Sequence, residues 1–273
     1  MSSALSWLSM RPSKGVAFAI HLTLSLLIFS TLVFMMALYW FPGELFFIDG
    51  GWQGLKLVAM VDLVLGPALT LLLYKPGKPK LVLDMSLIAA FQIAALGFGF
   101  FATYQQRTVA IVFSEKTFST LSAQANKEAD QELLALNVQP KPLPETSLLK
   151  LPLLLTPEPE NYGVYLEEIF NGYPGPNERS DQFVPLAAHR ESMRKHALTP
   201  AEVENAGASE AIDQALAKLS LATDNVELYK FKARYDNGIA IFDPRELRIL
   251  DFVTYDSKAQ PEAELEVADG EAQ

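Results

Sequence analysis

The chain has 273 residues, of which 32 are acidic and 22 basic, and half of its residues are hydrophobic. It contains no cysteine, which excludes a disulfide framework, a thiolate metal site and a cysteine nucleophile. Residues 1–104 carry a net charge of +2 and the remainder −12. A slightly basic, apolar third before an acidic two-thirds indicates two regions adapted to two solvents. The acidic balance also argues against a nucleic-acid partner, because phosphate binding needs a basic face.

Three apolar segments predict membrane spans at about 15–41, 55–74 and 81–104. About 20 apolar residues suffice for a helix to cross a bilayer core of about 30 Å. A signal peptide is the rival interpretation of the first segment. Its uncharged run of 27 residues is too long for one and ends in the bulky sequence YWFP. We therefore expect an uncleaved anchor and, over residues 15–104, a three-helix transmembrane bundle.

The basic residues of the short connecting segments predict the direction of the spans. Residues 1–14 carry two basic residues and the loop 75–80 carries three lysines, whereas the loop 42–54 carries two acids and no basic residue. The positive-inside rule then places the N-terminus and the second loop in the cytoplasm. We expect a multi-pass protein of a bacterial inner membrane, with a cytoplasmic stub at 1–14 and a periplasmic domain at 105–257.

Two polar side chains fall deep inside these spans. At about 1.5 Å per residue, Asp62 lies about 12 Å from the outer end of span two and Gln92 about 16 Å from the inner end of span three. Both lie near the bilayer midplane and could pair, whereas His21 is closer to the cytoplasmic face. Three roles stay open for the pair: a hydrogen bond between helices, a contact for the transmembrane helix of a partner, or an ion or proton relay.

Other residues of the spans complete the set of candidates for partner contact, which are Asp62, Gln92, Trp52 and Lys56. Trp52 is expected in an aromatic belt at the outer interface, and Lys56 is expected to extend its amine toward the same interface. Gly66 and Pro67 predict a kink in span two. Small residues give span three a surface suited to close packing, which we assign to contacts within the bundle: Ala90, Ala94, Ala95, Gly97 and Gly99.

The C-terminal region alternates short strand and helix patterns. A strand is predicted at 108–113, a helix at 119–136 and an extended, proline-rich segment at 140–159. Further helices are predicted at 161–170 and 184–197.

A capping box then begins a helix at Thr199, and Ser209 is expected to cap another. The alternating strand 229–235, the turn signal Asp236-Asn237-Gly238 and strands at 238–242 and 247–253 close the domain. We expect an α+β domain with a small antiparallel sheet, followed by an acidic, disordered tail at 258–273.

Few residues of this domain are candidates for chemistry. A basic stripe at Lys230, Lys232 and Arg234 is interpreted as the solvated face of a half-buried sheet. His189 and His196 share a helical face, but basic neighbours argue against a metal. The sequence shows no glycine-rich phosphate loop, no HExxH and no GxSxG pattern. We therefore predict no enzyme, no catalytic residue, no metal and no cofactor.

The segment 41–113 resembles the TfpX/TfpZ family of type IV pilin accessory proteins. The resemblance rests on GGWQG at 50–54, VDLVLGP at 61–67, QIAALG at 92–97 and YQQR at 104–107. It implies an inner-membrane protein that supports the stability, assembly or surface display of a type IV pilin, with the pilin and other assembly proteins as partners. It brings no catalytic residues.

Two other classes of function are weighed against this hypothesis. A membrane-anchored sensory module would bind a ligand through its periplasmic domain and would need a signalling partner, because the cytoplasmic segments expected here are short. A membrane enzyme or transporter would need a polar cavity, for which three spans with one deep acid offer little material.

Overall fold

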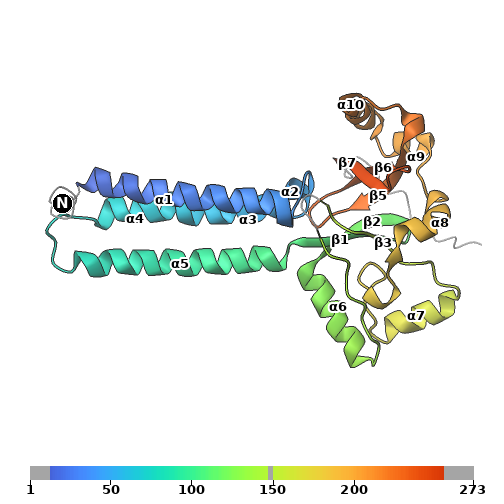
Figure 1. Cartoon of the computed structure of the whole chain (residues 1–273), viewed down its shortest axis with the longest axis horizontal. Coiled ribbons are helices and arrows are strands. Elements are labelled where there is room, and N and C mark those ends of the chain that lie inside the picture. The colour runs from blue at the N-terminus through green and yellow to red at the C-terminus, as the bar shows by residue number, and fades with distance from the viewer. Residues whose placement is uncertain (1–12, 147–149, 255–273) are drawn as a thin grey trace, which may run out of the picture. The chain divides into compact units, whose positions relative to one another are not determined.

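The computed structural model describes residues 13–146 and 150–254, which comprise long apolar helices and an α+β region (Figure 1). The chain divides into two compact units. Residues up to 110 and residues 120–152 form the first, and residues 111–119 with those from 153 onward form the second. The residues expected as a stub and as a disordered tail, apart from Ser13 and Lys14, lie outside the described residues.

The first unit is built mainly from helices. They are α1 (Lys14–Met35), continued by a π-helical turn (Met36–Trp40), α2 (Leu45–Ile48), α3 (Gly51–Ala59), a second π-helical turn (Met60–Leu65), α4 (Gly66–Leu73), α5 (Leu81–Gln105) and α6 (Ala123–Ala135). Helix α1 packs against α4 and α3, and α5 packs against the same two helices.

Three continuous helical stretches of this unit are long and apolar enough to cross a membrane: Lys14–Trp40, Gly51–Leu73 and Leu81–Gln105. The three predicted spans are thus present as candidate membrane helices, and the second begins four residues earlier than expected.

The expected irregularity of span two is a π-helical turn. Pro67 lacks a backbone N–H, and in a regular helix its ring would clash with the carbonyl of Leu63. The turn Met60–Leu65 widens the helix over this stretch and lets α4 continue from Gly66. Asp62 lies within the widened turn, so the π-helical turn that accommodates Pro67 also sets the position of this carboxylate.

The sheet has seven strands in the order β4-β3-β1-β2-β5-β6-β7. Their bounds are β1 Thr108–Ser114, β2 Thr117–Ser122, β3 Leu153–Leu155, β4 Val184–Pro185, β5 Glu227–Lys232, β6 Asn237–Asp243 and β7 Arg248–Thr254. The pairs β1–β3 and β2–β5 are parallel, whereas β3–β4, β5–β6 and β6–β7 are antiparallel. The predicted α+β class and the three late strands are confirmed, but the sheet is larger than expected and mixed.

Helices of the second unit are α7 (Tyr162–Phe170), α8 (Arg190–Arg194), α9 (Pro200–Asn205) and α10 (Ser209–Leu219). The core holds two groups of side chains. Four aromatic rings from β1, β2, β5 and β6 meet edge to face or tilted: Phe113, Phe118, Tyr229 and Phe242. Helices α9 and α10 bury Val203, Ile212 and Leu216 against the aliphatic side chains of β5, β6 and β7.

Several local predictions are corrected. Strand β2 occupies the first residues of the predicted helix 119–136, and Ser122 caps the shorter helix that follows. The predicted helix 184–197 begins instead with edge strand β4, where Pro185 can pair because an edge strand needs fewer donors. The N-cap of α10 is Ala208 and not Ser209, and Ala208 makes no side-chain cap bond.

The hairpin between β5 and β6 turns earlier than its sequence signal indicates. The backbone N–H of Ala233 donates to the carbonyl of Asp236, so Arg234 and Tyr235 form the turn. Gly238 lies inside β6, where a Cβ atom would overlap the backbone of Val253. This glycine permits a close approach of two strands.

Candidate functional site

A buried polar cluster lies between the three candidate membrane helices, and Asp62 is its centre. Its Oδ1 accepts a hydrogen bond of 2.9 Å from Ser25 Oγ of α1 and a longer contact of 3.5 Å from Gln92 Nε2 of α5. Ser25, Asp62 and Gln92 are each less than 10 % exposed. One side chain from each helix therefore meets at one level, and the predicted pairing of Asp62 with Gln92 is observed.

The second oxygen of Asp62 has a different environment. Oδ2 is buried and makes no hydrogen bond to any of the residues that the structure describes. A buried carboxylate oxygen without a donor is costly in an apolar medium. The cluster can therefore accept a further hydrogen bond at this atom.

Gly66 allows the cluster to close. A Cβ atom at this position would overlap the side-chain amide of Gln92. The glycine that precedes Pro67 thus lets α5 approach α4 closely enough for Gln92 to extend toward Asp62. The GP pair was predicted only as a kink, and this packing role was not foreseen.

A second polar contact joins α1 to α4. The imidazole Nδ1 of His21 lies 2.6 Å from the hydroxyl oxygen of Thr70, which is 4 % exposed. Both residues lie nearer the loop 75–80 than Asp62 does. The prediction that His21 misses the level of Asp62 agrees with this hydrogen bond to Thr70.

Trp52 and Lys56 lie outside the cluster, on the surface of α3. They are one turn apart, both are exposed, and the Lys56 amine lies 5.1 Å from the centre of the Trp52 ring. A cation over an aromatic face is stabilised electrostatically. The four predicted contact residues thus form two separate pairs, one buried and one on the surface, and their role toward a partner stays a prediction.

The small-residue surface of α5 is not used as expected. Gly99 is buried and faces Val58, but Ala90, Ala94 and Gly97 are exposed. The assignment of this surface to packing within the bundle is wrong for these three residues. Gln92 and Ile88 provide buried contacts of α5 instead.

Asp49 forms a third polar cluster that the sequence analysis missed. Its carboxylate is fully buried and accepts hydrogen bonds from the hydroxyls of Thr108, at 2.5 Å, and Thr120, at 2.7 Å. These bonds tie the loop after α1 to β1 and β2 within the first unit. The sequence showed only an acid in a short loop. The partners lie 59 and 71 residues away, and no local pattern signals them.

The second unit offers no metal centre in its described part, and neither does the first. Across residues 13–146 and 150–254, no group of three or more His, Asp or Glu side chains could hold a metal ion. His196 Nε2 instead lies 3.0 Å from a carboxylate oxygen of Glu158. Lys230 and Lys232 are exposed on β5, while Tyr229 and Phe231 of the same strand are buried, as expected for a half-buried sheet.

Comparison with curated proteins finds relatives for part of the chain. Over 105 residues, 38 % of the chain, it is 32 % identical to the fimbrial assembly protein of serogroups C1 and C2 of Dichelobacter nodosus, of which the match covers 80 %. The same length matches the fimbrial assembly proteins of serogroups I and E1 of that organism at 32 % and 31 % identity. The match covers only 41 % of these two relatives. Neither a protein-family model nor a solved structure matches the chain.

Proposed function

This chain belongs to the family of fimbrial assembly proteins, and from that premise we propose that it is an inner-membrane accessory protein of type IV pilus assembly. In this proposal it supports the stability, assembly or surface display of a cognate type IV pilin, as its resemblance to the TfpX/TfpZ proteins implies. The observation that carries the proposal is the match over 80 % of a curated fimbrial assembly protein. The proposal assigns no catalytic step, metal or cofactor to the chain.

The buried polar cluster supports a contact with a helix of the partner. A type IV pilin has a long apolar N-terminal helix. Because Asp62 Oδ2 is buried between the three helices, a pilin helix presents a donor to it when the helices beside Asp62 move apart. Hydrogen bonds between membrane helices contribute about 0.6 kcal/mol on average. Such a bond adds little affinity but selects partners that carry a donor at the right depth.

Gene deletion tests the proposal most directly. We expect a deletion strain to show reduced pilin levels, fewer surface pili and reduced twitching motility, and the full chain supplied in trans to restore them. Unchanged values of all three in the deletion strain would overturn the proposal.

Photo-crosslinking in living membranes tests the contact itself. A photoreactive residue at Met60 or Val64, exposed positions that flank Asp62, should capture the pilin, whereas one at Val82 near the start of α5 should capture it less. Asp62→Asn should weaken capture, because the carboxylate is lost as an acceptor. Ser25→Ala is the matched control, since it removes only an internal hydrogen bond. Equal capture by all variants would contradict a role for Asp62.

The proposed orientation is tested by reporter fusions. Alkaline phosphatase fused after residue 110 should be active, because the proposal places this point in the periplasm, and the same fusion within the loop 75–80 should be inactive. A reporter after residue 110 that works only in the cytosol would overturn the proposed topology.

A further inference from the structure

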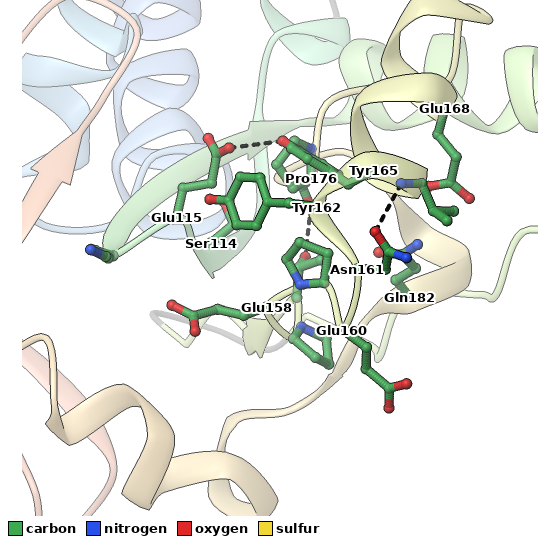
Figure 2. Close-up of a pocket in the computed structure, with 15 residues that line it drawn as sticks. Ser114, Glu115, Glu158, Glu160, Asn161, Tyr162, Tyr165, Glu168, Pro176 and Gln182 are labelled. Carbon is green, nitrogen blue, oxygen red and sulfur yellow. Dashed lines mark hydrogen bonds between the residues drawn. The ribbon is translucent and has the colours of Figure 1, made fainter.

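A pocket of about 700 Å³ opens in the second unit, beside α7 (Figure 2). It is lined by the hairpin turn between β1 and β2, by the segment 156–161 that leads into α7, and by α7 itself. Glu115 and Lys116 form the turn with positive φ angles of 46° and 67°. The pocket wall therefore combines a tight turn, a proline-rich segment and one face of a helix.

The lining of this pocket is strongly acidic. Among its described residues Lys116 is the one cation, and the carboxylates are Glu115, Glu158, Glu160 and Glu168. Glu168 is paired with Arg179, and Glu158 with His196. Glu115 belongs to the turn between β1 and β2 and Glu160 to the segment 156–161, and both are exposed. Exposed carboxylates on two elements of one pocket lining favour a cationic ligand.

Two tyrosines of α7 add aromatic surface to the acidic lining. The rings of Tyr162 and Tyr165 meet edge to face with centres 5.8 Å apart. Figure 2 shows the Tyr165 hydroxyl directed at Glu115, to which it donates a bond of 2.8 Å. Burial and this carboxylate raise the pKa of Tyr165 to about 12. The phenol stays neutral and holds the Glu115 carboxylate in place, while the exposed ring of Tyr162 offers its face to a cation.

Helix α7 exposes most of its apolar side chains. Only Tyr165 and Glu168 are half-buried, and the remaining large apolar residues of the helix are exposed: Tyr162, Val164, Leu166, Ile169 and Phe170. Phe170 is 87 % exposed. A surface helix normally turns such residues toward the core. Tyr162, Leu166, Ile169 and Phe170 are spaced four, seven and eight residues from the first and so share one face of the helix. An exposed apolar face beside a pocket is typical of a binding surface.

We propose that this pocket and the outer face of α7 bind an unfolded or extended polypeptide segment that carries a lysine or arginine among apolar residues. The basic side chain enters the pocket against the ring of Tyr162, where Glu115 and Glu160 add negative charge, and the apolar neighbours lie along α7. The proposal goes beyond the assembly role, because this site is separate from the membrane helices. It stands whether or not the partner is a pilin.

Charge complementarity decides between a basic polypeptide and a lipid surface. Anionic lipid attracts basic segments and is repelled by carboxylates. Glu168 is paired with Arg179 and Glu158 contacts His196, so Glu115 and Glu160 stand against Lys116 in the lining, and the chain after residue 104 has a net charge of −12. A cationic peptide is therefore the favoured occupant, and lipid binding is an outcome that the test must be able to show.

The test uses the full chain in nanodiscs of zwitterionic lipid and three fluorescent pentapeptides of sequence ALXLA, in which X is lysine, glutamine or glutamate. We expect the lysine peptide to bind about tenfold more tightly than the glutamine peptide at low salt, which corresponds to about 1.4 kcal/mol. The glutamate peptide should bind most weakly. Raising the salt should reduce these differences, because exposed charges are screened.

Matched variants locate the site. Glu115→Gln and Glu160→Gln should each weaken the lysine peptide severalfold, and together they should remove the preference for lysine over glutamine. Glu204→Gln removes an exposed carboxylate from α9 and should change nothing. Phe170→Ser should weaken the lysine and glutamine peptides equally, because it removes apolar contact only. Glutamine keeps an acceptor for Tyr165, and equal thermal midpoints of the variants confirm intact folding.

Two results would overturn the proposal. Equal affinity of the lysine and glutamine peptides for the wild-type chain would remove the cationic site. Binding of added phosphatidylglycerol vesicles that Phe170→Ser abolishes, and with which the lysine peptide does not compete, would assign α7 to a lipid surface instead. Loss of pilus assembly is not used as a readout, so failure here leaves the assembly proposal standing.

Discussion

The three long helices and the seven-stranded sheet place apolar and polar side chains in opposite ways. In the helices, Leu72 and Val82 are more than 70 % exposed, whereas Asp62 is 2 % exposed. In the sheet region, Phe118 and Tyr229 are fully buried and the lysines of β5 are exposed. The long helices thus expose apolar side chains, as suits a helix in lipid, and the sheet region exposes polar side chains, as suits a domain in water.

The comparison also shows what holds each region together. Burial of aromatic and aliphatic side chains stabilises the sheet in water. In lipid, apolar burial gives little driving force, so close packing and hydrogen bonds between helices must contribute more. Substitutions of the same chemical kind should therefore have different effects in the two regions.

The largest effect is expected in the aromatic core. Phe118→Ala removes a fully buried ring that contacts Phe113, Tyr229 and Phe242, and should lower the free energy of unfolding of the sheet region by about 3–5 kcal/mol. Hydrogen exchange of the β5 and β6 amides measures this loss. Phe170→Ala is the matched control, because its exposed ring should cost less than about 0.5 kcal/mol. Similar losses for both variants would contradict burial as the main source of stability.

The next largest effect is expected at Asp49, a buried carboxylate whose two oxygens both accept hydrogen bonds. Asp49→Ala leaves the hydroxyls of Thr108 and Thr120 without this acceptor, and should lower stability by about 2–3 kcal/mol. Protease cleavage within residues 108–122 should increase. Glu44→Ala removes an exposed acid of the same loop and should leave cleavage unchanged. Asp49 would then be a buried acid with hydrogen bonds to both oxygens, whereas Asp62 has them at Oδ1 and none at Oδ2 among the described residues.

Long-range regularity made much of this fold predictable from the sequence. The spans follow from their length and apolar composition, and the capping box at Thr199 forms as its pattern indicates. Strand β2 was missed because the turn before it has two non-glycine residues, Glu115 and Lys116, with positive φ angles. Such a conformation is rare for these residues, so neither of them indicates a hairpin turn.

The candidate site was only partly predictable for a similar reason. Asp62 and Gln92 are conspicuous in apolar spans, but Ser25 is not. Hydroxyls in membrane helices often bond to their own backbone, as Thr23 and Thr31 of α1 do. The sequence alone cannot distinguish those residues from Ser25, whose partner lies 37 residues away on another helix.

A smaller effect is expected from packing within the helices. Gly66→Ala places a methyl group where the amide of Gln92 lies, and should lower the stability of the helical region by about 1–3 kcal/mol. Gly97→Ala is the control, because no atom lies within 4 Å of its added methyl group. Unfolding in mixed detergent measures both variants. A neutral Gly66→Ala would mean that the approach of α5 to α4 does not depend on this glycine.

The smallest effect is expected at Glu202, which is an exposed carboxylate, unlike the buried Asp49 and Asp62. The backbone N–H and the hydroxyl of Thr199 each donate to Glu202 at 2.8 Å, and they lower the pKa of this carboxyl below its ordinary value of 4.5. The stabilisation is therefore present above pH 4.5 and is lost as the pH falls through the lowered folded-state pKa. The wild type should have a slightly higher midpoint temperature than Glu202→Gln at pH 7, and the difference should shrink as the pH is lowered from 4.5 toward 3.

Glu204→Gln is the control for this comparison, because it removes an exposed carboxylate of the same helix that lies outside the cap. Its midpoint should follow that of the wild type at both pH values. A difference between Glu202→Gln and the wild type that persisted near pH 3 would mean that the cap depends on the shape of the side chain and not on its charge.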